Sequence, residues 1–188
     1  MDLDFFSLWD GWRALASGAA VTIEITLAAL ILGCVLGLLI GLGRLNPKRR
    51  VIYGACTTYL TLVRGTPLLV QLFILFFGLP HFGIQLPAYV CGIFGLGIYS
   101  AAYVSEIVRG SIQSVEKGQM EAARSLGLPY KMAMRKVILP QAFVRMIPAL
   151  GNEFIALIKN SALVSLLTIA DVMHEGEKII SVSYRSLE

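Results

Sequence analysis

Four charged or amide side chains interrupt an apolar stretch near the C-terminal end of the chain. The stretch reads LGNEFIALIKNSALVSLLT, and its charged and amide members are Asn152, Glu153, Lys159 and Asn160. On a continuous helix, Asn152 and Lys159 share one face, and Glu153 and Asn160 share the neighbouring face. A small zwitterion such as an amino acid needs an anion near its amino group and a cation near its carboxylate. Glu153 and Lys159 supply one of each, so this group predicts substrate binding. The alternatives are an intramembrane structural pair across a dimer interface or, if the helix is broken, an anchor to lipid headgroups.

Other charged residues in apolar surroundings have several interpretations. Glu24 lies in the outer part of the first apolar stretch, where it either helps to select cationic substrates or is simply solvated. Glu106 and Arg109 are three residues apart, which favours a local ion pair near a helix end. Arg64 stands close to Pro67, and its guanidinium could satisfy carbonyls that the proline leaves free.

Residue patterns typical of an enzyme are missing from the sequence. The chain contains three cysteines and two histidines, and their spacing fits neither a metal site nor a disulfide framework. We find no Ser/His pair or paired carboxylates at a useful spacing within the apolar stretches. The sequence therefore predicts no catalytic residue and no metal ligand.

The composition indicates a protein of the lipid bilayer. Hydrophobic residues make up 56% of the 188 residues and charged residues only 15%, whereas a soluble domain carries about 25% charged residues. Runs such as LAALILGCVLGLLIGLG approach the roughly 20 residues that a helix needs to cross a bilayer. We expect an all-α, polytopic transmembrane bundle.

The positive charges predict the orientation of the crossings. The segment GRLNPKRR and the region 109–145 are rich in Lys and Arg, whereas GLPHFGIQLP at 78–87 has neither. Basic loops stay on the cytoplasmic side, so we expect both termini outside. The expected membrane spans are 20–43, 51–79 (broken at RGTP), 88–110 and 148–170. The expected remaining segments are an outer N-terminal segment 1–19, a cytoplasmic loop 111–147 and an outer segment 171–188.

The cytoplasmic loop contains the sequence GQMEAARSLGLPYKMAMRKVILPQ, which predicts two short helices. Glu121 would lie in the first turn of the first helix, and Gly127 would end that helix in a left-handed conformation. Pro129 suits the first turn of a second helix, which Leu139 and Pro140 would close. The loop could be a basic surface anchor or a rigid knob that docks into a cytoplasmic partner.

Several long segments resemble one family. EAARSLG followed by ILPQA resembles the cytoplasmic EAA loop of ABC importer permeases. VRGTPLLVQLFILFFGLP, YSAAYVSEIVRGSIQSVEKGQMEAARSLG and ILPQAFVRMIPALGNEFIALIKNSALVSLLTIADV resemble the polar amino-acid uptake branch, which carries histidine, glutamine, glutamate or arginine. The resemblance covers roughly residues 17–188 and implies the type I ABC importer permease fold, in which a fifth helix would follow the last segment.

The resemblance also implies how the protein works. Residues 118–127 would be the helix that couples to an ATPase, with Glu121, Ala122, Ala123 and Gly127 as motif residues. This chain has no G-x-x-x-x-G-K-[ST] phosphate loop, so we expect it to bind no cofactor, with ATP and Mg held by the partner ATPase. The implied partners are a cytoplasmic ABC ATPase dimer, a second permease subunit in a homo- or heterodimer, an extracytoplasmic solute-binding protein, an amino-acid substrate and the lipid bilayer. No nucleic acid is expected.

The leading functional interpretation is therefore the permease subunit of an ATP-driven importer in the bacterial cytoplasmic (inner) membrane. Such a subunit would move polar amino acids inward by alternating access and would catalyse nothing by itself. The alternative is a self-contained secondary carrier or channel for small polar solutes. That alternative predicts transport that survives without ATP and without an ATPase partner.

Overall fold

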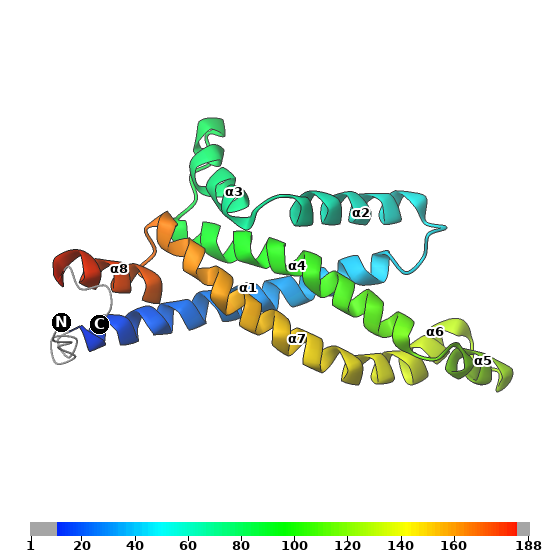
Figure 1. The fold of residues 1–188 in the computed structure, drawn as a ribbon. Helices are drawn as coiled ribbons and strands as arrows, with labels where there is room; N and C mark the ends of the chain where they lie inside the picture. Colours follow the sequence, from blue (N-terminus) through cyan, green and yellow to red (C-terminus); the bar gives the residue numbers. More distant parts are fainter. Residues whose placement is uncertain (1–10, 184–188) are drawn as a thin grey trace. The chain divides into compact units, whose positions relative to one another are not determined.

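A computed structural model describes residues 11–183, and every regular element in that range is a helix (Figure 1). The α-helices are α1 (Trp12–Gly43), α2 (Arg50–Gly65), α3 (Leu68–Phe73), α4 (Ala88–Ser114), α5 (Lys117–Ser125), α6 (Tyr130–Ala133), α7 (Leu139–Ser161) and α8 (Val172–Ser183). Two π-helical turns, Ile74–Gly78 and Met134–Ile138, and two 3-10 turns, Leu79–Phe82 and Ala162–Leu167, extend them. The all-α fold class is confirmed. Most of the predicted outer N-terminal segment, residues 1–10, lies outside the described range.

Within residues 11–183, three segments are long and apolar enough to cross a bilayer as single helices: Trp12–Gly43, Ala88–Ser114 and Tyr130–Leu167. The helices Arg50–Gly65 and Leu68–Phe82 pass the same test only when taken together, which makes up to four candidate spans. The break between these two helices falls at Pro67, which is extended at φ −60° and ψ 138° and precedes α3. A proline lacks the amide N–H and disfavours helical geometry in the residue before it, so the helix stops there.

The end predicted for the second cytoplasmic helix is wrong. Leu139 and Pro140 do not close it, because α6, the π turn Met134–Ile138 and α7 run on continuously. The Leu139 amide bonds to the carbonyl of Met134, five residues earlier, which is the pattern of a π turn. Pro140 has no amide N–H to bond, so the widened turn before it lets the helix continue. The segment Tyr130–Leu167 has 38 residues, or about 57 Å, and so exceeds the bilayer core of about 30 Å.

The chain forms two compact units, and α1, α4 and α7 each contribute residues to both. Within the described range, one unit contains 11–31, 66–97 and 156–183, and the other contains 32–65 and 98–155. The second unit has an apolar core on α4, α7 and the segments joining them: Val104, Val108, Ile112, Val115, Ile138, Ala142 and Met146.

Close contact between α1 and α4 organises the second unit. Gly33, Gly37 and Gly41 recur every four residues on the face of α1 that meets α4. A Cβ atom added to Gly37 would stand 2.7 Å from the Val104 side chain, and one added to Gly41 would stand 2.8 Å from the Ser105 carbonyl oxygen. Neither distance allows a side chain, so the glycines let the two helices approach closely.

In the first unit, α1 packs against the start of α8. A Cβ at Gly18 would lie 2.8 Å from the Asp171 carbonyl oxygen. Thr22 Oγ1 accepts a hydrogen bond of 3.1 Å from the Val172 amide. The fully buried Asp171 carboxylate accepts one of 2.9 Å from the His174 amide, which caps the first turn of α8.

Helix α5 ends in a Schellman motif, as its glycine predicts. Gly127 has φ +81°, in the left-handed region. Its amide bonds to the Arg124 carbonyl at 3.0 Å, and the Leu128 amide bonds to the Ala123 carbonyl at 3.2 Å. The predicted place of Glu121 is wrong, because α5 already begins at Lys117. Glu121 is therefore its fifth residue and lies beyond the first turn, where it cannot cap the helix.

Candidate functional site

The first candidate site lies in the second unit, where Glu153 of α7 meets α4. Glu153 is partly buried, and its Oε1 accepts a hydrogen bond of 2.9 Å from the Ser100 hydroxyl. Ser100 is fully buried, and α1 lies against it because Gly33 has no Cβ atom, which would stand 2.9 Å from Ser100 Oγ. A carboxylate can accept about four hydrogen bonds. Among the described residues only Ser100 donates one to Glu153, so the carboxylate can still accept bonds from a ligand.

Two tyrosines next to Ser100 continue this polar group along α4. The Tyr99 hydroxyl lies 3.0 Å from the Tyr103 hydroxyl, within hydrogen-bonding distance, and the ring centroids are 4.9 Å apart. The Arg64 guanidinium of α2 lies over the Tyr103 ring, 5.3 Å from its centroid, which is a cation–π contact. Ser100, which donates to Glu153, lies one turn before Tyr103 on α4. An anion and a cation therefore contact residues one turn apart on the same helix, inside one unit.

Arg64 lines a cavity of about 410 Å³ in the same unit. Thr57, Thr61 and Tyr103 also line it. The two threonine hydroxyls already donate to backbone carbonyls four residues earlier, whereas the Tyr103 hydroxyl accepts from Tyr99 and can still donate to an anion. The volume falls within the roughly 300–1,000 Å³ typical of small-molecule sites. We interpret the cavity as suited to a small anionic group such as a carboxylate.

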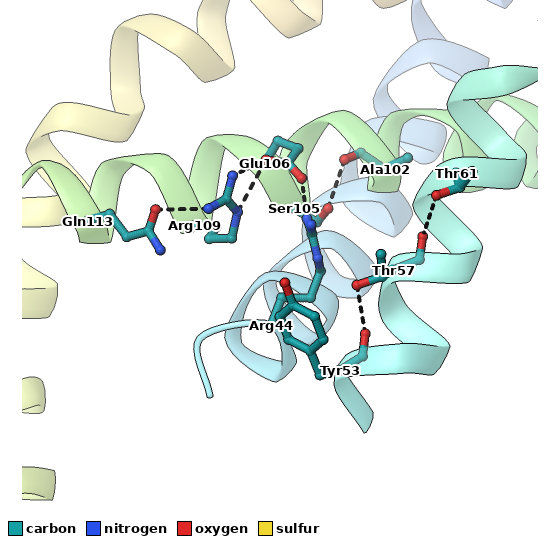
Figure 2. A network of polar contacts seen from close by, with 9 residues as sticks. All are labelled: Arg44, Tyr53, Thr57, Thr61, Ala102, Ser105, Glu106, Arg109 and Gln113. Atoms are coloured by element: carbon teal, nitrogen blue, oxygen red, sulfur yellow. Dashed lines mark hydrogen bonds and ion pairs between the residues drawn. The ribbon is translucent and has the colours of Figure 1, made fainter. Parts of the chain in front are cut away.

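A second glutamate, Glu106, also lines this cavity, and two arginines already neutralise its charge. Figure 2 shows it on α4 between Arg44 and Arg109. Arg44 Nη1 bonds to its Oε1, and Arg109 Nη2 lies 2.7 Å from its Oε2. Arg109 also donates a hydrogen bond of 2.8 Å to Gln113. The predicted Glu106–Arg109 pair is confirmed, and Arg44 is a partner that the sequence interpretation missed.

The remaining predicted substrate residues have no comparable partners. Asn152 and Lys159 are exposed on α7, and Asn160 is partly buried on the same helix. Glu24 is exposed on α1, close to the Tyr89 phenol in the first unit. Their role in binding substrate stays a prediction.

The sequence analysis predicted that the Arg64 guanidinium bonds to backbone carbonyls that Pro67 leaves free. It gave no role to Tyr99, Ser100 or Tyr103. Tyr99, Ser100 and Tyr103 are separated by one and three residues on α4, and that spacing puts them along one side of a helix. The motif YSAAY at residues 99–103 is therefore the sequence feature that could have indicated this polar group. Its connection to Arg64 could not be read from the sequence, because Arg64 and Tyr103 are 39 residues apart.

The second candidate site is α5 with the turn that follows it. Glu121 and Ala122 are exposed, whereas Ala123 is only 4% exposed and packs within its own unit. Leu126 is 84% exposed at the end of the helix, although sequence reasoning gave it no role. An exposed surface of acid, alanine and leucine on a short capped helix can dock into an apolar groove of another protein. Ala123 and Gly127 shape this surface, and the other three residues present it.

Known proteins are similar in sequence to this chain over most or all of its length. The arginine transport system permease protein ArtQ of Bacillus subtilis (strain 168) is 39% identical over 189 residues, which cover 100% of this chain and 86% of ArtQ. The putative glutamine transport system permease protein GlnP of Rickettsia prowazekii (strain Madrid E) is 40% identical over 169 residues, covering 89% of this chain and 77% of GlnP. The L-cystine transport system permease protein TcyB of Bacillus subtilis (strain 168) is 39% identical over 168 residues, covering 89% and 71%.

Solved structures share the fold. A chain described as "Crystal structure of an amino acid ABC transporter with histidines" matches with a TM-score of 0.93 and 44% identity, covering 100% of this chain and 87% of that one. An inward-facing MetNI methionine ABC transporter matches with a TM-score of 0.71 at 20% identity, covering 97% and 93%. The second likeness supports the fold alone.

The family assignment follows from the extent of these matches. The sequence profile described as "Binding-protein-dependent transport system inner membrane component" matches residues 33–186. This range includes the glycine face of α1 and all of α2 to α8. It therefore contains both candidate sites, Glu153 with Ser100 and the helix α5. The chain belongs to the family of binding-protein-dependent transport system inner membrane components.

Proposed function

We propose that this chain is the permease subunit of an ATP-driven importer of polar amino acids. One observation carries the proposal: Glu153 contacts Ser100 and Arg64 contacts Tyr103, so an anion and a cation meet residues one turn apart on α4 in one compact unit. An α-amino acid carries the complementary charges. The names of the arginine, glutamine and cystine permeases that are similar to this chain support the same class of substrate.

In this proposal the substrate carboxylate binds at the Arg64 cavity and its amino group faces Glu153. The Arg64 guanidinium and the Tyr103 hydroxyl can donate to the carboxylate, and Glu153 can accept bonds beyond the one from Ser100. Asn152, Lys159, Asn160 and Glu24 are retained as further candidates for contact with substrate, because they are polar and lie in apolar helices.

The energy for transport comes from a partner in this proposal. A cytoplasmic ABC ATPase dimer binds ATP and Mg, and its closure moves α5 through contacts with Glu121, Ala122 and Leu126. Two permease subunits, identical or not, then open the substrate site alternately to each side, and an external binding protein delivers the substrate. The basic loops support an orientation in which α5 lies in the cytoplasm and the N-terminus lies outside, in a bacterial inner membrane.

The substrate site is tested by ATP-driven uptake in proteoliposomes that contain the permease, its ATPase and its binding protein. Glu153→Gln keeps an oxygen that can accept from Ser100 but removes the charge, and we expect uptake to fall at least about 100-fold. Glu177→Gln, an exposed change on α8, is the matched control and should transport normally. Uptake by Glu153→Gln at the control level would contradict the assignment of Glu153.

The coupling site is tested by purification of the assembled transporter. Ala122→Glu and Leu126→Glu add charge to the exposed surface of α5, so we expect the ATPase to be lost from the permease. Lys131→Gln, exposed on α6, should retain the ATPase. If the wild-type permease transports amino acids without ATP and without any ATPase, the chain acts instead as a secondary carrier or channel.

A further inference from the structure

A cavity of about 620 Å³, separate from the two candidate sites, opens in the second unit at the end of α1 and the start of α2. Leu42, Ile52 and Met134 form apolar walls, and Lys48 and Arg49 bring two positive charges to it. No Asp or Glu lines it. A cavity with apolar walls and two cations suits a molecule that has an apolar tail and an anionic head.

The basic end of the cavity is shaped by the short turn between α1 and α2. Asn46 Oδ1 accepts a hydrogen bond of 3.1 Å from the Lys48 amide, and the Asn46 carbonyl accepts one of 3.1 Å from the Arg49 amide. This is an Asx turn, which holds the local backbone in a defined conformation. The ion pairs among residues 11–183 involve Arg44, Arg109 and Lys178, and none involves Lys48 or Arg49. Both cations are therefore free to bind an external anion.

The apolar side of the cavity borders exposed apolar side chains. Leu42 is 38% exposed and Ile52 is 45% exposed. Neighbouring Leu39 and Val51 are 63% and 86% exposed. Water penalises the exposure of so much contiguous apolar surface, whereas acyl chains do not. The cavity thus lies at the level where hydrocarbon gives way to lipid headgroups, because Gly43 ends the apolar span and the basic turn begins directly after it.

We propose that this cavity binds one anionic phospholipid of the cytoplasmic leaflet. The phosphate lies between Lys48 and Arg49, with Tyr130 as a further hydroxyl at the same cavity, and an acyl chain runs along Leu42 and Ile52. The cytoplasmic leaflet follows from the orientation in the proposed function, whereas the binding site itself depends only on residues of the second unit. Basic pockets beside membrane helices on the cytoplasmic side commonly hold such headgroups.

The test measures lipid that stays bound to the full-length permease, purified with its ATPase from vesicles of phosphatidylcholine with a minority of phosphatidylglycerol. Native mass spectrometry counts the retained lipid of each kind. Each basic side chain contributes about fivefold in affinity for an anionic lipid. We therefore expect Lys48→Gln with Arg49→Gln to weaken retention of phosphatidylglycerol about 25-fold. The charge-preserving pair Lys48→Arg with Arg49→Lys should retain it.

The matched control is Arg50→Gln with Arg135→Gln, which removes the same charge close by but outside the cavity lining. Its retention of phosphatidylglycerol should equal that of the wild type. Equal loss in both double variants would overturn the site, because it would indicate a general surface attraction. Retention of phosphatidylcholine as strong as that of phosphatidylglycerol would also overturn it. None of these results depends on transport, so the proposed function stands or falls separately.

Discussion

Glu106 and Glu153 are two glutamates on the packed helices of one unit, but their surroundings differ. Glu106 bonds to two arginines, Arg44 from the end of α1 and Arg109 from its own helix. Glu153 accepts one hydrogen bond, from the neutral hydroxyl of Ser100. The charge of Glu106 is compensated within the chain, whereas the charge of Glu153 has no cation in direct contact among the described residues.

The difference separates a structural carboxylate from one that can bind a ligand. A glutamate paired with arginines stabilises the helix contact. Its charge and acceptor sites are already used by these strong donors, so it is poorly suited to bind a substrate. A glutamate that accepts from one hydroxyl keeps its charge available, at a cost in stability while the site is empty. The same contrast holds for the cations, since Arg44 contacts Glu106 whereas Arg64 lies over a tyrosine ring beside a cavity.

The largest effect on stability is expected at Glu106. Glu106→Gln leaves Arg44 with an uncompensated charge, and the Arg44 side chain is only 12% exposed. We expect the free energy of unfolding to fall by about 3 kcal/mol, measured by titration with denaturing detergent. Glu153→Gln should lower it by less than about 1 kcal/mol, because no charge loses its partner. Equal losses in the two variants would contradict the comparison.

A double-mutant cycle sharpens the role of each arginine. We expect a coupling of about 2 kcal/mol between Arg44 and Glu106, since both side chains are mostly buried. The coupling between Arg109 and Glu106 should be below about 1 kcal/mol, because Arg109 is 31% exposed and lies three residues along the same helix. The same unfolding assay on Arg44→Met, Arg109→Met, Glu106→Gln and the two double variants gives both values. A larger coupling for Arg109 would reverse the ranking.

A smaller effect is expected from the one donor to Glu153. Ser100→Ala removes that hydrogen bond and leaves a slightly smaller side chain against Gly33. We expect the free energy of unfolding to fall by about 1 kcal/mol and the KM for the amino acid to rise, because Glu153 is no longer held in place. Ser111→Ala, in which the changed hydroxyl is on the same helix but away from Glu153, is the control. Unchanged uptake kinetics in Ser100→Ala would remove Ser100 as a positioning residue.

The smallest effect concerns Asp171, a third buried carboxylate, which lies beyond the candidate spans. Burial raises the pKa of Asp171 above its ordinary value, although the amides of His174 and Met173 oppose the shift. The folded state therefore keeps a proton that the unfolded state has already released, so stability falls as the pH rises through the interval between the two pKa values. We expect Asp171→Asn to flatten this fall in the unfolding midpoint measured across acidic to neutral pH. An unchanged pH profile would show that Asp171 does not contribute.

The helical fold and the break at RGTP could be predicted because both follow from local properties. Hydropathy identifies apolar helices, and proline interrupts a helix through its own covalent structure. The glycine face of α1 was visible for the same reason, since Gly33, Gly37 and Gly41 share one side of any helix. The continuation of the helix through Pro140 was missed because a π turn depends on how the surrounding residues pack, and a short sequence does not specify it.

The candidate site was predicted only in part. Glu153 stood out because a charge in an apolar stretch is costly wherever the chain folds. Its neighbours Ser100 and Tyr99 lie more than 50 residues away in the sequence, on another helix. Nothing local distinguishes them from other small or aromatic residues of α4. The exposure of Leu126 could not be predicted either, because leucine is usually buried and its position depends on the turn that Gly127 closes.

The sequence by itself determined the class of protein, the number of apolar stretches, the basic loops and the family to which the chain belongs. These depend on composition and local spacing, which do not change with the folded arrangement. Only the tertiary structure decided which charges are neutralised and which are left for a ligand. Arg44 reaches Glu106 across 62 residues, and Arg64 reaches Tyr103 across 39. Such pairs form where glycines and small side chains let the helices approach within a few ångströms, and that approach is a property of the whole fold.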